Sequence, residues 1–266
     1  MDIALVYMVA GMSSRFGGIP KQLAKVGPND ETLIEISLNQ AIGAGFTKIV
    51  FIVGEKTEEP FKELFKDSYK GIPVFYAKQT FDVNTRDKPF GTVDAVLSAK
   101  NILDEPFVVA NGDDLYGRDA FLQLVSLAKK GSFNATVGYL LKDSLPENGT
   151  VNRGIFSEQD GFVTTIVEEL HISKDNVVDR NLTMHSLCNM NIFLLQKNVL
   201  TLLEKQFSLF KEEHKDSRTA ECLLPVELSN LIVSNAVTLV LLKSSEKCLG
   251  ITNPEDAAIL RDILSS

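Results

Sequence analysis

The feature that most constrains the fold lies at the start of the chain, where an apolar segment runs directly into a loop rich in glycine and serine. Residues 3–9 predict a buried strand, and residues 10–21 read Ala-Gly-Met-Ser-Ser-Arg-Phe-Gly-Gly-Ile-Pro-Lys. Glycine allows close approach of the backbone, so N–H groups in such a loop can converge on an anion. Arg15 and Lys21 add positive charge for phosphates. The segment therefore predicts a loop that holds a nucleoside triphosphate.

Two standard phosphate-binding motifs do not account for this loop. A Walker A motif needs a second glycine followed by lysine, but the fifth residue after Gly11 is Phe16. The dinucleotide-binding motif fails because Ser13 and Phe16 stand where glycines are required. For the loop taken alone, an ordinary turn between a strand and a helix, with a chance basic pair, is the alternative interpretation.

Strand-like and helix-like segments alternate through the first half of the chain. Apolar runs predict strands at 3–9, 48–53, 74–77 and 107–110. Helical spacing of apolar residues predicts helices at 33–44, 60–69, 92–102 and 121–128. This alternation predicts an α/β fold with a mostly parallel central sheet and helices on both faces. Thr32 is the expected cap of its helix.

The pattern changes near residue 133. Extended segments are expected at 135–141, 154–156, 162–167, 187–195 and 237–242. Helices are expected at about 197–213, at 220–233 and from Pro254 onward. We expect one domain, 1–266, in which residues 1–132 bind the nucleotide and residues 133–266 extend the sheet and form an acceptor lobe. The charged residues between Gln79 and Gly91 predict a mobile loop over the site.

Composition excludes several classes of protein. The net charge of −8 argues against general affinity for nucleic acid, which needs clustered basic residues. The sequence predicts neither a signal peptide nor a segment that spans a membrane. Cys188, Cys222 and Cys248 are far apart, which predicts buried free thiols in a reducing compartment. We therefore expect a cytoplasmic protein with no membrane or nucleic-acid partner; a homo-oligomer is compatible with the sequence.

Two carboxylates follow the apolar segment 107–110. Residues 111–114 read Asn-Gly-Asp-Asp, directly after the expected strand. Ligands of open α/β sheets bind at the carboxyl ends of strands, so these carboxylates and the phosphate loop are expected at one edge. Adjacent carboxylates repel unless a cation is near, and Mg²⁺ prefers oxygen ligands and phosphates. We predict a magnesium site at Asp113; a polar turn whose aspartate caps the helix near Arg118 is the alternative.

These segments resemble the motifs of the sugar-1-phosphate nucleotidyltransferases. The pattern A-G-G-x-G-[ST]-R followed by P-K is approached by residues 10–15 and 20–21, with Ser13 in place of a usual glycine. Residues 79–95 resemble the element Q-…-G-[TL]-x-x-A, and residues 112–114 resemble G-D-[DN]. The resemblance implies the Rossmann-like fold of nucleotide-diphospho-sugar transferases. It implies that the nucleotide is bound by Ala10, Gly11, Ser13, Ser14, Gln79, Gly91, Thr92 and Gly112.

The second half contains further matches to that family. Asn152-Arg-Gly154 and Glu168-Glu169 resemble a glycine and an E-E-K-P segment that contact the sugar phosphate. Leu170 stands where the family has its phosphate-binding lysine, and Arg153, Lys174 or a residue elsewhere are the alternatives for that role. Asn189 and Asn191, two residues apart on a strand, would bind sugar hydroxyls or face solvent. The expected acceptor-binding residues are Asn152, Gly154, Glu168, Glu169, Asn189 and Asn191.

The resemblance also implies a reaction. A nucleoside triphosphate and a phosphorylated acceptor, most simply a sugar-1-phosphate, would give an NDP-sugar and pyrophosphate. Arg15 would hold the leaving pyrophosphate, Lys21 would neutralise the α-phosphate, and Asp113 would bind Mg²⁺. Asp256 is the expected second metal ligand, with Thr252 and Asn253 as alternatives.

Three other functions stay open. One is a glycosyltransferase of the related fold that uses an NDP-sugar as donor. Another is a cytidylyltransferase for a non-sugar phosphomonoester such as phosphocholine. The third is a non-catalytic nucleotide-binding regulator.

Overall fold

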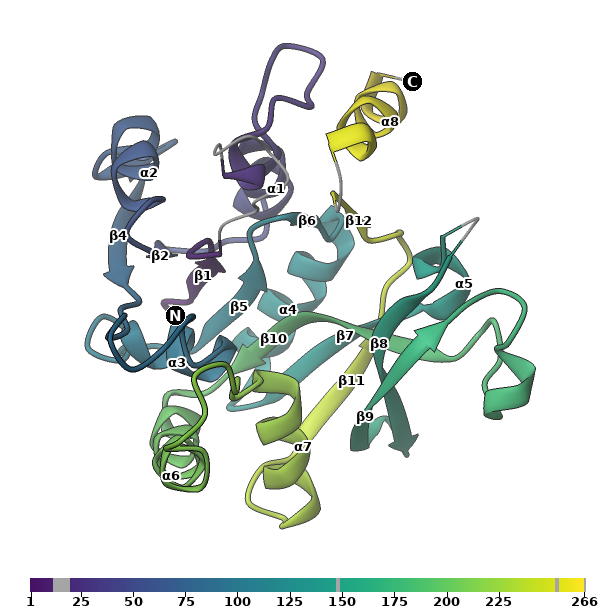
Figure 1. The fold of residues 1–266 in the computed structure, drawn as a ribbon. Coiled ribbons are helices and arrows are strands. Elements are labelled where there is room, and N and C mark those ends of the chain that lie inside the picture. The colour runs from purple at the N-terminus through teal and green to yellow at the C-terminus, as the bar shows by residue number, and fades with distance from the viewer. Residues whose placement is uncertain (12–19, 147–148, 252–253, 266) are drawn as a thin grey trace.

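The computed structural model describes residues 1–11, 20–146, 149–251 and 254–265, and these form an α/β fold around one large sheet (Figure 1). The strands of this sheet are β1 (Ala4–Met8), β2 (Lys48–Val53), β3 (Ser68–Tyr69), β4 (Ile72–Lys78), β5 (Phe107–Asn111), β7 (Asn134–Leu140), β8 (Val151–Gln159), β9 (Phe162–Ile172), β10 (Leu187–Leu195) and β11 (Leu239–Lys243). Two short strands pair separately, β6 (Asp114–Leu115) and β12 (Leu249–Gly250).

The α-helices connect these strands. They are α1 (Leu33–Ile42), α2 (Glu58–Phe65), α3 (Thr92–Ser98), α4 (Arg118–Lys130), α5 (Leu141–Ser144), α6 (Lys197–Glu213), α7 (Leu224–Val233) and α8 (Pro254–Ser265). Short 3₁₀ helices occupy η2 (Lys21–Leu23) and η3 (Val178–Arg180). The expected helix cap is confirmed, since Thr32 Oγ1 accepts from Glu35 N and Thr32 N donates to the Glu35 carboxylate at 2.8 Å.

The strand order is β3-β4-β2-β1-β5-β10-β7-β11-β9-β8. β4, β2, β1 and β5 are mutually parallel neighbours, as helix crossovers between strands require. β10 is antiparallel to both β5 and β7, and β8 and β9 form an antiparallel hairpin. The α/β class is thus confirmed. The parallel arrangement belongs to the first half, and the second half extends the same sheet with strands in mixed orientation.

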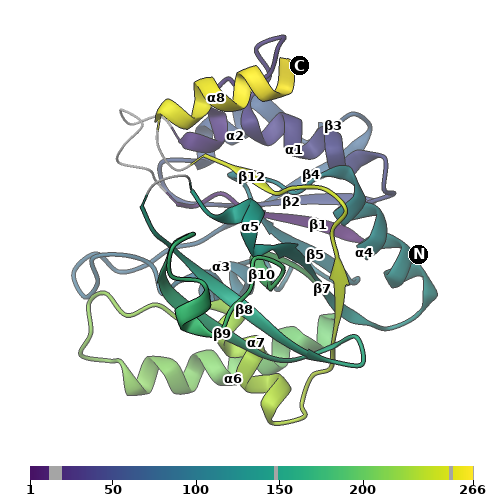
Figure 2. The ribbon, with the colours of Figure 1, turned by 90° about the vertical axis from the view of Figure 1, so that its right-hand side faces the viewer.

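Alternate residues of β1 and its flanks pack against opposite helical layers. Ile3, Leu5 and Tyr7 belong to a core that includes residues of α1, α2 and α4. Ala4 and Val6 belong to a second core with residues of α3, α6 and α7. Helices therefore cover both faces of the sheet, as expected. Figure 2 shows α8 on the side of α1, opposite α6 and α7.

One predicted helix is too long. The segment 60–69 was expected to be helical, but α2 ends at Phe65 and residues 68–69 form the strand β3. Lys66 adopts a positive φ of 52°, which stops the helix. Lys70 and Gly71 then turn the chain into β4, with positive φ at both positions. The spacing of apolar residues in the sequence does not indicate where this helix ends or where the chain turns back.

Residues 80–90, expected to form a mobile loop, are held to the segment between α6 and α7. Arg86 is only 4% exposed, and its Nη1 and Nη2 donate to the carbonyl oxygens of Ser217 and Ala220 at 2.9 and 2.5 Å. Its guanidinium lies over the ring of Phe90, 3.5 Å from the ring centre. The buried guanidinium of Arg86 therefore links the first half of the chain to the segment between α6 and α7 in the second half.

The cysteine and membrane expectations concern the whole chain. Cys188, Cys222 and Cys248 are free and buried, as predicted. In the described part of the chain, every helix is too short or too polar to cross a membrane.

Candidate active site

The carboxyl edge of the parallel strands brings together the described ends of the predicted phosphate loop and the predicted carboxylates. β1 and β5 are neighbours in register, with Met8 opposite Asn111, so the segments that follow them emerge side by side. Gly112 N donates to Met8 O at 3.1 Å, and a Cβ on Gly112 would overlap the Val9 side chain. The expectation that both segments share one edge is confirmed.

Lys21 and Asp113 form an ion pair at this edge. Lys21 opens η2, and its Nζ pairs with the Asp113 carboxylate and donates to Ile251 O at 3.5 Å. Both side chains are half-buried, so the pair is screened less than a surface pair. Ser13, Ser14 and Arg15 lie outside the described residues, as do Thr252 and Asn253.

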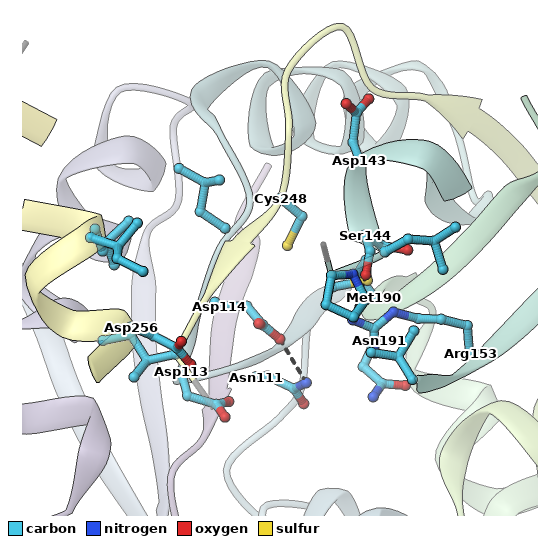
Figure 3. A pocket seen from close by; sticks show the side chains of 18 of the residues that line it. Asn111, Asp113, Asp114, Asp143, Ser144, Arg153, Met190, Asn191, Cys248 and Asp256 are labelled. Atoms are coloured by element: carbon cyan, nitrogen blue, oxygen red, sulfur yellow. Dashed lines mark hydrogen bonds between the residues drawn. The ribbon is translucent and has the colours of Figure 1, made fainter. Parts of the chain in front are cut away.

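A cavity of about 480 Å³ opens beside this ion pair (Figure 3). It is lined by residues from five parts of the chain, among them Lys21, Asp113, Arg153, Asn189, Asn191 and Asp256. Figure 3 shows Asp113 and Asp256 on one side of the view and Arg153 and Asn191 on the other. The cavity is therefore bounded by residues of the first half of the chain, by the strands β8 and β10, and by α8.

Asp114 lines the same cavity next to Asp113, and its carboxyl has a raised pKa. Burial, followed by the charge of Asp113, raises the pKa of the Asp114 carboxyl from 3.8 to about 7. Asn111 Nδ2 donates to its Oδ2 at 3.0 Å, and Ser37 Oγ donates to its backbone oxygen at 3.2 Å. Burial and the neighbouring charge thus favour the protonated form of Asp114, while the carboxylate of Asp113 pairs with Lys21.

A buried tyrosine fixes the distance between the two halves of the site. Tyr116 OH donates to Met190 O at 2.8 Å and accepts from Asn111 N at 3.0 Å. Asn111 ends β5, and Met190 lies between the two asparagines of β10. One hydroxyl therefore links the strand that delivers Asp113 to the strand that delivers Asn189 and Asn191.

The donor set of the cavity fits a hard divalent cation. Asp113 and Asp256 both line it, and two carboxylates together with substrate phosphates are the usual environment of Mg²⁺. Within the ranges that the structure describes, no group of three or more His, Cys, Asp or Glu residues forms a complete metal cage. The substrate phosphates would therefore have to supply the remaining oxygen ligands.

The expected nucleotide residues of the first half also make contacts within the protein. Gln79 Nε2 donates to Gly91 O at 3.0 Å and to Asp94 Oδ2 at 2.7 Å. Gly91 has a φ of 96°, and a Cβ there would lie 2.7 Å from the Cys222 oxygen. Thr92 Oγ1 accepts from Leu224 N at 2.7 Å. These contacts within the protein account for Gln79, Gly91 and Thr92 without a bound nucleotide. The nucleotide-binding roles of these residues stay predictions, as do those of Ala10, Gly11 and Gly112.

The acceptor residues divide into two groups. Asn189 and Asn191 line the cavity; Asn189 Nδ2 donates to Asn191 Oδ1 at 2.9 Å, and Asn191 has a φ of 58° at an irregularity of β10. Asn152, Gly154, Glu168 and Glu169 are absent from the lining of this cavity in the described part of the chain. Their acceptor-binding roles stay predictions.

Two of these residues have other partners. Asn152 Oδ1 accepts from His171 N at 2.9 Å, and Glu169 pairs with Arg180 at 3.1 Å. Arg153, given in the sequence only as one alternative, lines the cavity instead. In the pairing of β8 with β9 it lies opposite Glu169. Side chains alternate between the two faces of a strand, so Arg153 of β8 points away from the face of Asn152 and Gly154. Knowledge of the β8–β9 register would have shown which face lines the cavity.

The fold of the chain is similar to several solved structures. Similar folds are seen in a UDP-glucose pyrophosphorylase complexed with UDP-glucose (17% identity, TM-score 0.70, covering 100% of this chain and 99% of that one) and a putative glucose-1-phosphate thymidylyltransferase from Bacillus anthracis (15%, 0.70, 98% and 95%). The inositol-1-phosphate CTP transferase from T. maritima is also similar (14%, 0.68, 100% and 97%). No curated protein matches in sequence. A family model described as nucleotidyl transferase matches residues 8–227, and the chain therefore belongs to the nucleotidyl transferase family.

Proposed function

We propose that this chain joins a nucleoside triphosphate to a sugar-1-phosphate, giving an NDP-sugar and pyrophosphate. The observation that carries the proposal is the cavity at which Lys21 and Asp113 of the first half meet Asn189 and Asn191 of the second. Phosphate-binding charge and hydroxyl-binding amides on opposite walls suit a substrate with a phosphate at one end and hydroxyls at the other. The names of the similar structures, which include a UDP-glucose pyrophosphorylase, fit this class.

The reaction needs alignment and charge neutralisation more than proton transfer. An oxygen of the acceptor phosphate forms a bond to the α-phosphorus while the bond from that phosphorus to the bridging oxygen breaks. The electron pair of the broken bond leaves with pyrophosphate. Because the acceptor phosphate is already anionic near neutral pH, no protein base is required. Lys21 would neutralise the α-phosphate, and Arg15 would hold the leaving pyrophosphate.

Asp113 and Asp256 are the proposed ligands of Mg²⁺. When bound, the ion would neutralise charge on the phosphates and help to align donor and acceptor. The Lys21–Asp113 ion pair supports this arrangement, because it places the carboxylate of Asp113 beside a positive charge at the phosphate end of the cavity. Asp113→Asn is expected to reduce turnover severely, and Asp114→Asn less.

Gln79 is the proposed base-reading residue. Because its Nε2 donates to Gly91 and Asp94, base recognition would depend on its Oε1, which accepts hydrogen bonds. An acceptor at this position favours a base that presents an N–H group to it. The identity of the base follows from the screen below.

A pyrophosphate-release screen tests the function. The protein would be mixed with each of the four common nucleoside triphosphates and with glucose-1-phosphate, inositol-1-phosphate or phosphocholine, with Mg²⁺ or with a chelator. We expect magnesium-dependent pyrophosphate from one sugar-phosphate pair, lost in Asp113→Asn. Release only with phosphocholine would replace the acceptor class. Release of a nucleoside diphosphate from an NDP-sugar would indicate a glycosyltransferase, and binding without turnover a regulator.

A further inference from the structure

Arg153 presents a guanidinium to the cavity with incomplete partners. Its Nη1 donates to its neighbour Asn152 O at 3.1 Å, and its Nη2 to Ser144 O at 3.4 Å. Its Nε is buried and lacks a hydrogen-bond partner among the described residues. In Figure 3 the side chain extends from β8 toward Asn191. A buried donor without a partner is costly, so the position favours an additional acceptor group.

The other cations around the cavity differ from Arg153. Lys21 is paired with Asp113, and Lys247, next to the lining residue Cys248, is paired with Asp143 at 3.2 Å. Across the described ranges, no carboxylate lies within ion-pair distance of Arg153. Its two Nη groups donate to backbone carbonyls, and Glu168 and Asp114 act on its charge only from beyond ion-pair distance. A partly buried guanidinium without an ion-pair partner favours an anionic ligand.

The position that carries lysine in similar enzymes cannot supply this charge here. Leu170 is 50% exposed and is not among the residues that line the cavity. The next residue, His171, has a φ of 57°, and the β8–β9 register shifts between Val151 and Arg153. The register shift lies where Val151 and Arg153 of β8 line the cavity. The hairpin therefore presents Arg153, and not residue 170, to the site.

We propose that Arg153 binds the phosphate of the acceptor, taking the place of the lysine that is missing at residue 170. The inference rests on the proposed function, because it needs an acceptor that carries a phosphate. A planar guanidinium binds two phosphate oxygens at once, which a lysine cannot do. Two oxygens held by Arg153 leave a third to face the α-phosphorus near Lys21. The amide of Asn191, on the same wall, would then lie beside the sugar.

The first test uses the protein without nucleotide or metal, and inorganic phosphate as the probe. The Nε–Hε signal of Arg153, assigned by its absence in Arg153→Lys, is followed by NMR during a phosphate titration. We expect this signal to shift, and Arg153→Gln to weaken phosphate binding by about 10- to 100-fold, as loss of a charged hydrogen-bond partner implies. The matched control is Arg118→Gln, an exposed arginine outside the cavity, which should bind phosphate as the unchanged protein does.

The second test uses the substrate pair found by the pyrophosphate screen. Arg153→Gln should raise the acceptor KM about tenfold or more and leave the KM of the triphosphate unchanged. Arg153→Lys should lie between, because it keeps the charge and loses the planar fork. An Arg153 signal that stays still at saturating phosphate would overturn the inference, and so would an unchanged acceptor KM. If no pair releases pyrophosphate, the proposed function fails, and the NMR titration still decides whether Arg153 binds phosphate.

Discussion

The two walls of the cavity are built by different means. On the proposed nucleotide side, Asp113 directly follows the parallel strand β5, and Lys21 opens η2, which comes after β1 in the chain. On the acceptor side, Arg153, Asn189 and Asn191 lie within strands, and an irregularity of β10 positions the two asparagines. A residue at a strand end is positioned by the strand alone. A residue on a strand face also depends on pairing register, so the acceptor wall can change its specificity through a one-residue shift.

The largest expected effect tests the nucleotide wall. Lys21→Ala should reduce turnover by about 100-fold or more, because one charge-stabilising contact in the transition state is lost. The fold should persist, as judged by circular dichroism and melting temperature. Lys205→Ala, on the exposed side of α6, is the control and should keep full activity. Arg15→Ala is expected to behave as Lys21→Ala does. Near-normal turnover in both variants would remove the loop from the site.

An intermediate effect is expected for the carboxyl of Asp114, next to Asp113 on that wall. Because the folded-state pKa of Asp114 is raised from 3.8 to about 7, the folded protein binds this proton more tightly than the unfolded chain. Stability from this group is therefore full below pH 3.8 and is lost as pH rises to about 7. The whole shift corresponds to at most about 4 kcal/mol, since one pKa unit is about 1.4 kcal/mol. We expect roughly half of that, because Asp114 lines the cavity and is partly exposed to solvent.

Asp114→Asn measures this cost, because it keeps the shape and removes the ionisation. In magnesium-free urea unfolding, the variant should be more stable than the unchanged protein by about 2 kcal/mol at pH 8 and by less at pH 5. Equal gains at both pH values would mean that the carboxyl is ionised normally. The nucleotide wall would then be wetter than its contacts indicate.

The smallest expected effect is on the acceptor wall. Glu169 is engaged with Arg180 outside the cavity lining, and half-exposed ion pairs of this kind contribute about 0–1 kcal/mol. Glu169→Ala should raise the acceptor KM no more than about threefold and leave the KM of the triphosphate unchanged. Steady-state kinetics with both substrates varied give the two values. A tenfold rise in the acceptor KM would indicate that Glu169 contacts the acceptor. The contrast between the two walls would then be weaker.

The same contrast explains what could be predicted from the sequence. The residues at strand ends could be predicted from the sequence. Apolar runs locate β1 and β5, and the polar residues that come after each run are then identified by their positions in the sequence. The Asn189–Asn191 spacing gave the right strand. The position of Arg153 was not accessible, because it depends on the pairing of β8 with β9, which no local pattern encodes. The hairpin of β3 and β4 was missed for a related reason, since Phe65 and Tyr69 keep helical spacing while Lys66 does not keep helical φ.

Arg86 limits how such an enzyme can be rearranged. A buried guanidinium whose hydrogen bonds reach Ser217 and Ala220 cannot keep its contacts if residues 133–266 are exchanged for those of a relative with a different chain path there. The buried charge of Arg86, left without its hydrogen-bond partners, would destabilise the hybrid protein even if the residues that line the cavity were kept. Acceptor preference is therefore better transplanted as single side chains on β8 and β10 than as a whole half. New substrate specificities in this fold are expected to evolve in the same way, through single substitutions on these strands.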